Sequence, residues 1–238
     1  MKTVVHRAQT RGTADYGWLK ANYSFSFANY FDPDRLQFGL LRVLNDDFIA
    51  PSMGFGKHPH DNMEIVTIPL KGALKHKDSM QHEGVIRPGE VQVMSAGSGL
   101  EHSELNASAS EETNILQLWV FPEKKDVKPR YDQKLFDEAA KTNTFLTVVS
   151  PADDNDGNAL WIHQQAYFNL GNFSEGSAGS YRLANAEHGV YVFVIEGSIR
   201  VADEELHKRD AIGIRELEHI RIESLTDSKL LLIEIPMN

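Results

Sequence analysis

The chain has 238 residues, of which 41% are hydrophobic and 24% charged, so it can bury a core and does not have the composition of a disordered protein. It contains no cysteine, which excludes disulfides, thiolate metal sites and cysteine nucleophiles. The formal net charge of −10 argues against direct nucleic-acid binding, which needs a basic surface. The N-terminal segment lacks a signal-peptide core, and no apolar run approaches the roughly 20 residues of a membrane span. We therefore expect a cytoplasmic protein that binds neither membranes nor nucleic acid directly.

Short segments rich in β-branched and aromatic residues follow one another along the chain, separated by turn clusters that contain Gly, Pro, Asn or Asp. This spacing predicts an all-β protein built as an antiparallel sandwich or barrel. The predicted strands cover residues 64–70, 90–94, 115–121, 145–149, 190–195, 198–202, 211–214, 219–223 and 230–235.

One segment, residues 132–141 (DQKLFDEAAK), has the composition of a helix. It follows residues 122–130, which contain two prolines and four basic residues and have the character of a linker. The sequence therefore predicts two domains, at residues 1–130 and 131–238.

The two halves carry related patterns. EIVTIPLKG, which ends at Gly72, matches VYVFVIEG, which ends at Gly197, and each is followed by another predicted strand. Later in each half the tripeptide Leu-Glu-His occurs, ending at His102 and at His219. The order of these matches predicts an internal duplication.

Two triplets in the first half carry candidate metal ligands. His58-Pro59-His60 precedes the strand at 64–70, and His102-Ser103-Glu104 follows the strand at 90–94. In extended backbone, residues two apart point to the same face, so each triplet presents two ligand groups in one direction. If the two segments face each other, three imidazoles and one carboxylate converge. That set suits iron, zinc, manganese, nickel, cobalt or copper and leaves coordination positions open.

With ten histidines in the chain, one His-x-His triplet arises easily by chance, so His58 and His60 have the alternative interpretation of a solvated loop. The His-x-Glu triplet about 40 residues later favours the metal site. His76 and Asp78 are also two apart, and we leave open whether they support such a site or lie exposed on a hairpin.

The segments GFGKHPHDNMEIVTIPLKG and GSGLEHSELN resemble the two cupin motifs. Together with TADYGWLKANYSFSFANYFDP, LRVLNDD, HKDS and MSAGSGLEHSE, in this order, they are similar to bacterial pirin-like proteins. The resemblance implies two jelly-roll-like cupin barrels in tandem, with few short helices and a divalent metal, Fe(II) in the family, in the first barrel. The family's metal ligands correspond to His58, His60, His102 and Glu104.

The general cupin pattern differs at two positions. It has Gly where Ser52 stands, and it uses as a ligand the glutamate that corresponds to Glu64. In pirins the carboxylate ligand corresponds to Glu104, so we interpret Glu64 as a residue that supports the ligands, with an exposed acid at the strand start as the alternative.

The second half does not repeat the ligands. His58 and His60 correspond to Leu183 and Asn185, and Glu104 corresponds to Arg221. One imidazole beside a cation does not hold a divalent ion, so the sequence predicts a second barrel without a metal.

The resemblance implies quercetin 2,3-dioxygenase activity for some members and transcriptional co-regulation for others. The first hypothesis is a metal-dependent dioxygenase that binds a small aromatic substrate and dioxygen, with Glu104 as the catalytic residue. The alternative is a non-enzymatic iron-binding redox sensor that acts through a protein partner. A structural cupin, or an isomerase with another metal, is the third hypothesis.

Overall fold

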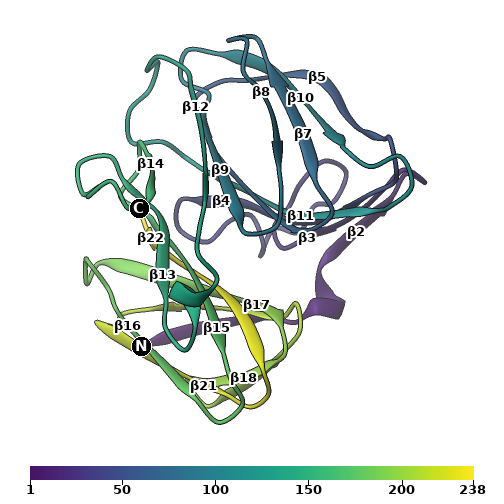
Figure 1. Cartoon of the computed structure of the whole chain (residues 1–238). Helices are drawn as coiled ribbons and strands as arrows, with labels where there is room; N and C mark the ends of the chain where they lie inside the picture. The colour runs from purple at the N-terminus through teal and green to yellow at the C-terminus, as the bar shows by residue number, and fades with distance from the viewer.

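The computed structural model describes residues 1–238 as two β-barrels, the first above the second in Figure 1. Each barrel consists of a seven-stranded sheet and a four-stranded sheet. Helical structure is limited to two single turns, η1 (Ala8–Thr10) and η2 (Ala139–Lys141). The predicted all-β fold with two tandem barrels and few short helices is confirmed, and no helix is long and apolar enough to cross a membrane.

The chain forms 22 strands. The first eleven are β1 (Lys2–His6), β2 (Gly12–Asp15), β3 (Leu19–Tyr23), β4 (Leu41–Ile49), β5 (Gly54–His60), β6 (Glu64–Lys71), β7 (Leu74–Asp78), β8 (Glu83–Ile86), β9 (Glu90–Ser95), β10 (Leu100–Asn106) and β11 (Thr113–Val120). The other eleven are β12 (Arg130–Leu135), β13 (Leu146–Pro151), β14 (Leu160–Ile162), β15 (Tyr167–Phe173), β16 (Ala178–Arg182), β17 (His188–Glu196), β18 (Ser198–Val201), β19 (Glu204–His207), β20 (Ala211–Arg215), β21 (His219–Ser224) and β22 (Ser228–Pro236). All nine strands predicted from the sequence are present.

The strand orders of the two barrels confirm the duplication. The sheets of the first barrel have the orders β12-β9-β6-β11-β4-β3-β2 and β5-β10-β7-β8. Those of the second have the orders β1-β20-β17-β22-β15-β13-β14 and β16-β21-β18-β19. The strands β1 to β11 correspond one to one to the strands β12 to β22. The only difference is at one sheet edge, where β3-β2 of the first barrel is matched by β13-β14 and not by β14-β13.

The two barrels exchange their first strands. β1, at the start of the chain, pairs with β20 in the second barrel, where Figure 1 shows the N-terminal strand in purple. β12 pairs with β9 at the equivalent edge of the first barrel. From the matching strand orders and these two pairings, we propose that residues 1–130 and 131–238 are the two repeats of the chain. Each repeat then supplies one strand to the other's barrel.

The predicted helix at 132–141 is wrong. Residues 130–135 form β12, and only 139–141 make a helical turn. The edge of β9 offers a row of backbone hydrogen-bonding partners, and Gln133 lies opposite Gln92 in that pairing. Pairing along a sheet edge outweighs a local helix preference of a few tenths of a kcal/mol per residue.

The largest apolar core lies between the barrels. It joins Val66 and Leu118 of the first barrel to Phe168 and Tyr191 of the second. The seven-stranded sheets therefore pack against each other, with one face of each turned to the partner barrel and the other face turned inward.

Candidate metal centre

Three adjacent strands of one four-stranded sheet carry the predicted ligands. β10 lies between β5 and β7, and His102 of β10 is directly opposite His58 of β5. On the other side of β10, Asp78 lies opposite His102, and His76 lies opposite Glu104. Because residues paired across a sheet share a face, these side chains point to the same side, the interior of the first barrel.

The imidazoles of His58, His60 and His102 form a tight group. Their ring centroids are 4.4 Å apart for His58 and His102 and 4.9 Å apart for the other two pairs. One ring nitrogen of each residue lies within 4.8 Å of the other two. A second, deeper group joins His102 to Glu104 and His76 within the same distance. The structure thus places the other three predicted ligands, His58, His60 and Glu104, around His102 and adds His76 to this group.

The nitrogens of His102 indicate what this cluster is for. Neither nitrogen has a hydrogen-bond partner, although the residue is only 1% exposed. Buried polar atoms are nearly always hydrogen-bonded, so this imidazole is placed to bind something else. Burial, with the neighbouring His58 and His60, lowers the pKa of His102 to about 2, and burial lowers the pKa of His60 to about 4. Both rings are neutral at pH 7, the state a divalent metal requires, and the cluster fits such an ion.

His58 is oriented by its own strand. Its Nδ1 lies 2.7 Å from the Gly56 carbonyl oxygen, and because a carbonyl only accepts, Nδ1 carries the proton and Nε2 offers a lone pair. His58 and His60 are half-buried, whereas His102 and Glu104 are fully buried. The site is therefore reached from the side of β5.

Glu104 lies at the bottom of the site. Gln117 donates from Nε2 to one carboxylate oxygen over 2.7 Å, and the Thr67 hydroxyl contacts the other over 3.5 Å. Burial raises the pKa of Glu104, because no cation lies near enough to compensate the buried charge fully. A bound cation would remove this cost, which is a second reason why the residues fit a metal.

A row of polar side chains crosses the seven-stranded sheet at the level of Thr67. The cross-strand register aligns one residue from each of six strands. From β12 to β3 they are Gln133, Gln92, Thr67, Gln117, Asn45 and Tyr23. In the second barrel the equivalent positions on β1, β20, β17 and β22 are Val5, Ile212, Val192 and Leu232. Further along the same row, β15 and β13 carry the polar pair Asn169 and Thr147. The first barrel therefore has polar residues at four positions under its ligands where the second barrel has Val, Ile, Val and Leu.

His76 and Asp78 are buried, so the exposed-hairpin alternative is wrong. Asp78 accepts from His76 Nε2 over 3.2 Å and from His82 Nδ1 over 3.1 Å. The other His76 nitrogen, Nδ1, has no partner, and Tyr131 of β12 stacks on the ring with a centroid distance of 4.5 Å. His76 therefore lines the deep side of the metal site, held in place by Asp78.

Glu64 is neither a supporting residue of the ligands nor an exposed acid. Along β6 it alternates with Ile65 and Thr67, so it shares a face with Val66, which belongs to the core between the barrels. It is 1% exposed and accepts a hydrogen bond from the Ser95 hydroxyl over 2.7 Å. Burial raises the pKa of Glu64 to about 7.

Apart from His219, the positions of the second barrel that correspond to the ligands carry other residues. Leu183 packs in its apolar core, and His219 is exposed on β21, opposite Arg182. The buried His188 donates a hydrogen bond from Nδ1 to Glu234 over 2.8 Å, so this nitrogen has a partner within the protein.

Sequence reasoning missed Gln117 and Thr67. A signal was available, because each is a polar residue inside an otherwise apolar strand run, ILQLWV and EIVTIPL. Most polar side chains in buried strands have a polar partner, so such a residue points to a polar group nearby.

Two barrels of this strand order, with a His-x-His strand beside a His-x-Glu strand in one of them, define a two-barrel cupin protein. The family model described as Pirin matches residues 4–120, and a model described as the quercetinase C-terminal cupin domain matches residues 147–235. The chain belongs to the pirin family.

Relatives match over nearly the whole chain. A protein named quercetin 2,3-dioxygenase from Escherichia coli K12 is 38% identical over 232 residues, 98% of each chain. A pirin-like protein from Caulobacter vibrioides is 40% identical over 223 residues, 94% of this chain and 95% of its own. The crystal structure of the Escherichia coli pirin YhhW in complex with nickel(II) has a TM-score of 0.92 and 36% identity and covers 99% of both chains. The cluster and these similarities together support a divalent metal site in a dioxygenase-like protein.

Proposed function

We propose that this protein is a metal-dependent dioxygenase that opens the ring of a flavonol such as quercetin. His58, His60, His102 and Glu104 hold the metal, and Fe(II) is the metal we propose. The observation that carries the proposal is His102, a fully buried, neutral imidazole with two unpartnered nitrogens at the centre of the ligand group. Relatives named quercetin 2,3-dioxygenase support the reaction class.

The bound metal would supply open positions for the substrate hydroxyl and for dioxygen. The three histidines fix its position. Glu104 either stays on the metal or, after moving off it, accepts the proton of the flavonol hydroxyl, since a buried carboxyl with a raised pKa is a competent base.

Aromatic side chains lie beside the two half-buried histidines of the site. Trp119 packs edge-on against His60 with ring centroids 4.9 Å apart, and Phe27 packs against Trp119. Phe55, in contact with Trp18, lies 6.3 Å from His58. Flat aromatic walls beside a polar, metal-binding floor suit a polyphenol.

The experiment is an anaerobic titration of the Fe(II)-loaded protein with quercetin, followed by admission of oxygen. A metal-dependent shift of the flavonol absorption, then its loss with oxygen uptake, is expected. A protein that binds iron but shows neither change would contradict the dioxygenase and favour the sensor hypothesis. Partner capture that differs between the ferrous and ferric forms would then test that alternative.

A further inference from the structure

A cleft of about 440 Å³ lies between the two barrels, and no predicted ligand lines it. Its walls come from the end of β6, the turn before β9, the η2 turn, β15, β17 and the start of β22. Ile68, in its lining, shares a face with Val66 and not with Thr67, so the cleft is on the opposite side of the sheet from Glu104. The volume is in the range that holds a small organic ligand, and such sites favour domain interfaces.

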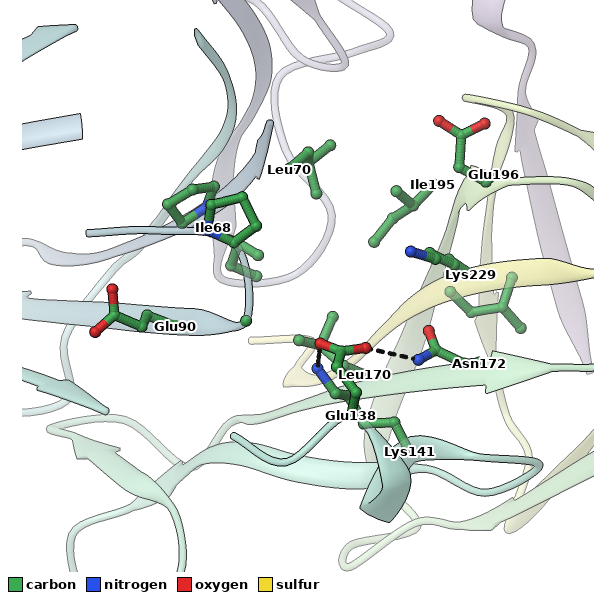
Figure 2. Close-up of a pocket in the computed structure, with 14 residues that line it drawn as sticks. Ile68, Leu70, Glu90, Glu138, Lys141, Leu170, Asn172, Ile195, Glu196 and Lys229 are labelled. Carbon is green, nitrogen blue, oxygen red and sulfur yellow. Dashed lines mark hydrogen bonds and ion pairs between the residues drawn. The ribbon is translucent and has the colours of Figure 1, made fainter. Parts of the chain in front are cut away.

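The cleft has an apolar floor that continues the core between the barrels. Ile68 and Ile195 are members of that core, and Leu70 and Leu170 pack against it. Figure 2 shows Leu70 and Ile195 on opposite sides of the opening, with Leu170 below them. A ligand therefore needs an apolar body.

The acidic residues of the lining already have partners. Glu138 pairs with the buried Lys141 and accepts from Asn172 over 3.0 Å. Glu196 pairs with Lys208 over 2.9 Å. Glu90 accepts from the Arg87 backbone N–H and from Gln133. The charges of Glu138 and Glu196 are therefore compensated by lysines, whereas Glu90 is held by neutral donors.

Lys229 is the exception among the charged groups of the cleft. No partner lies within salt-bridge or hydrogen-bond distance of its ammonium group, although its charge helps to lower the pKa of Glu138. Figure 2 shows this group directed into the opening, between Ile195 and Asn172. One unpaired cation above an apolar floor is complementary to a small molecule with one negative charge. We propose that the cleft is a second ligand site, which binds a small carboxylate with an apolar or aromatic body through Lys229.

The test uses 1-naphthoate and its neutral analogue 1-naphthylmethanol as probes, with methyl NMR of Ile and Leu side chains in the zinc-loaded protein. Naphthoate is expected to shift the methyl signals of Ile68, Leu170, Ile195 and Leu230, with weaker binding of the alcohol. Lys229→Glu should weaken naphthoate binding between about threefold and tenfold, and Lys229→Arg should retain it. The exposed Lys20→Glu, on β3, is the control and should bind as the wild type does.

Equal affinity of the wild type and Lys229→Glu, equal affinity for the two probes, or shifts located elsewhere would each overturn the proposal. Lys229 is exposed, so its variants should fold. The outcome is independent of the dioxygenase proposal because Lys229→Glu leaves every metal ligand in place, and its metal content should equal that of the wild type.

Discussion

Gln117 donates a hydrogen bond from Nε2 to Oε2 of Glu104 over 2.7 Å, and Trp119 fixes the direction of that bond. The Trp119 indole N–H donates to the other end of the amide, Oε1 of Gln117, over 3.2 Å. An indole only donates, so the amide oxygen must face Trp119 and the NH₂ group must face the carboxylate. The same strand therefore orients the deepest predicted ligand and supplies an aromatic wall beside His60.

Replacement of Gln117 by Leu should lower the metal affinity about 10- to 100-fold, the usual effect of losing a partner that orients a ligand. Competition with a chelating dye would measure the affinity. Gln92→Leu is the matched control, because Gln92 lies in the same polar row but neither of its amide atoms has a partner. Its metal affinity should stay close to wild type and its melting temperature should not fall, since removing an unsatisfied buried amide has no cost in lost bonds. Equal losses of affinity in both variants would contradict the assigned role of Gln117.

Replacement of His102 by Ala should remove most of the bound metal, with a loss of affinity of at least about 100-fold, since it removes a ligand and not only a partner of one. Elemental analysis after purification would measure the metal content per chain. His219→Ala is the control, because that residue ends the equivalent Leu-Glu-His tripeptide but is exposed on the second barrel. A His102→Ala protein with unchanged metal content would refute the ligand assignment.

Glu64 should make the protein less stable as the pH rises. Its pKa is about 7 in the folded protein against an ordinary 4.5, so the folded state holds the proton more tightly than the unfolded state does. Stability is then lost between pH 4.5 and 7, and Glu64→Gln should be more stable than the wild type above pH 7 by up to about 3 kcal/mol. Below pH 4.5 the difference should vanish.

Urea denaturation of both proteins at pH 4, 6 and 8 would show this dependence. Glu83→Gln is the control, because Glu83 is exposed and its ion pairs with Lys75 and Lys77 lower its pKa, the opposite direction. If the free energies of unfolding of Glu64→Gln and the wild type differ by the same amount at all three pH values, the pKa of Glu64 is not raised.

Arg209 ties the second barrel to the first. Its Nε lies 3.4 Å from Oδ2 of the buried Asp46, and its Nη2 donates to Asn114 over 3.1 Å. Arg209→Ala should lower the free energy of unfolding by about 2 kcal/mol, less than the 3–5 kcal/mol of an unpaired buried charge because Arg11 still faces Asp46. Arg200→Ala, which removes only exposed ion pairs, should cost less than about 1 kcal/mol. Urea denaturation would measure the free energy of unfolding of both variants. Equal decreases in the two variants would mean that the contact of Arg209 with Asp46 and Asn114 does not stabilise the fold.

Much of the fold followed from local patterns. Each predicted strand is present because β-branched runs between turn residues have few other stable states, and the repeated strand-glycine-strand pattern indicated the duplication. The pair of triplets around His58 and His102 was readable for the same reason, since residues two apart on a strand always share a face.

The sequence by itself predicted nine of the 22 strands, the duplication and the two triplets of candidate ligands, because alternation and spacing are properties of neighbouring residues. The tertiary structure alone decided which strands meet. It paired β10 with β7 and so placed His76 beside Glu104, it laid β12 on the edge of β9 in place of a helix, and it turned Glu64 toward the other barrel. Those outcomes depend on partners tens of residues away, whose backbone hydrogen bonds and burial outweigh any preference encoded in the local sequence.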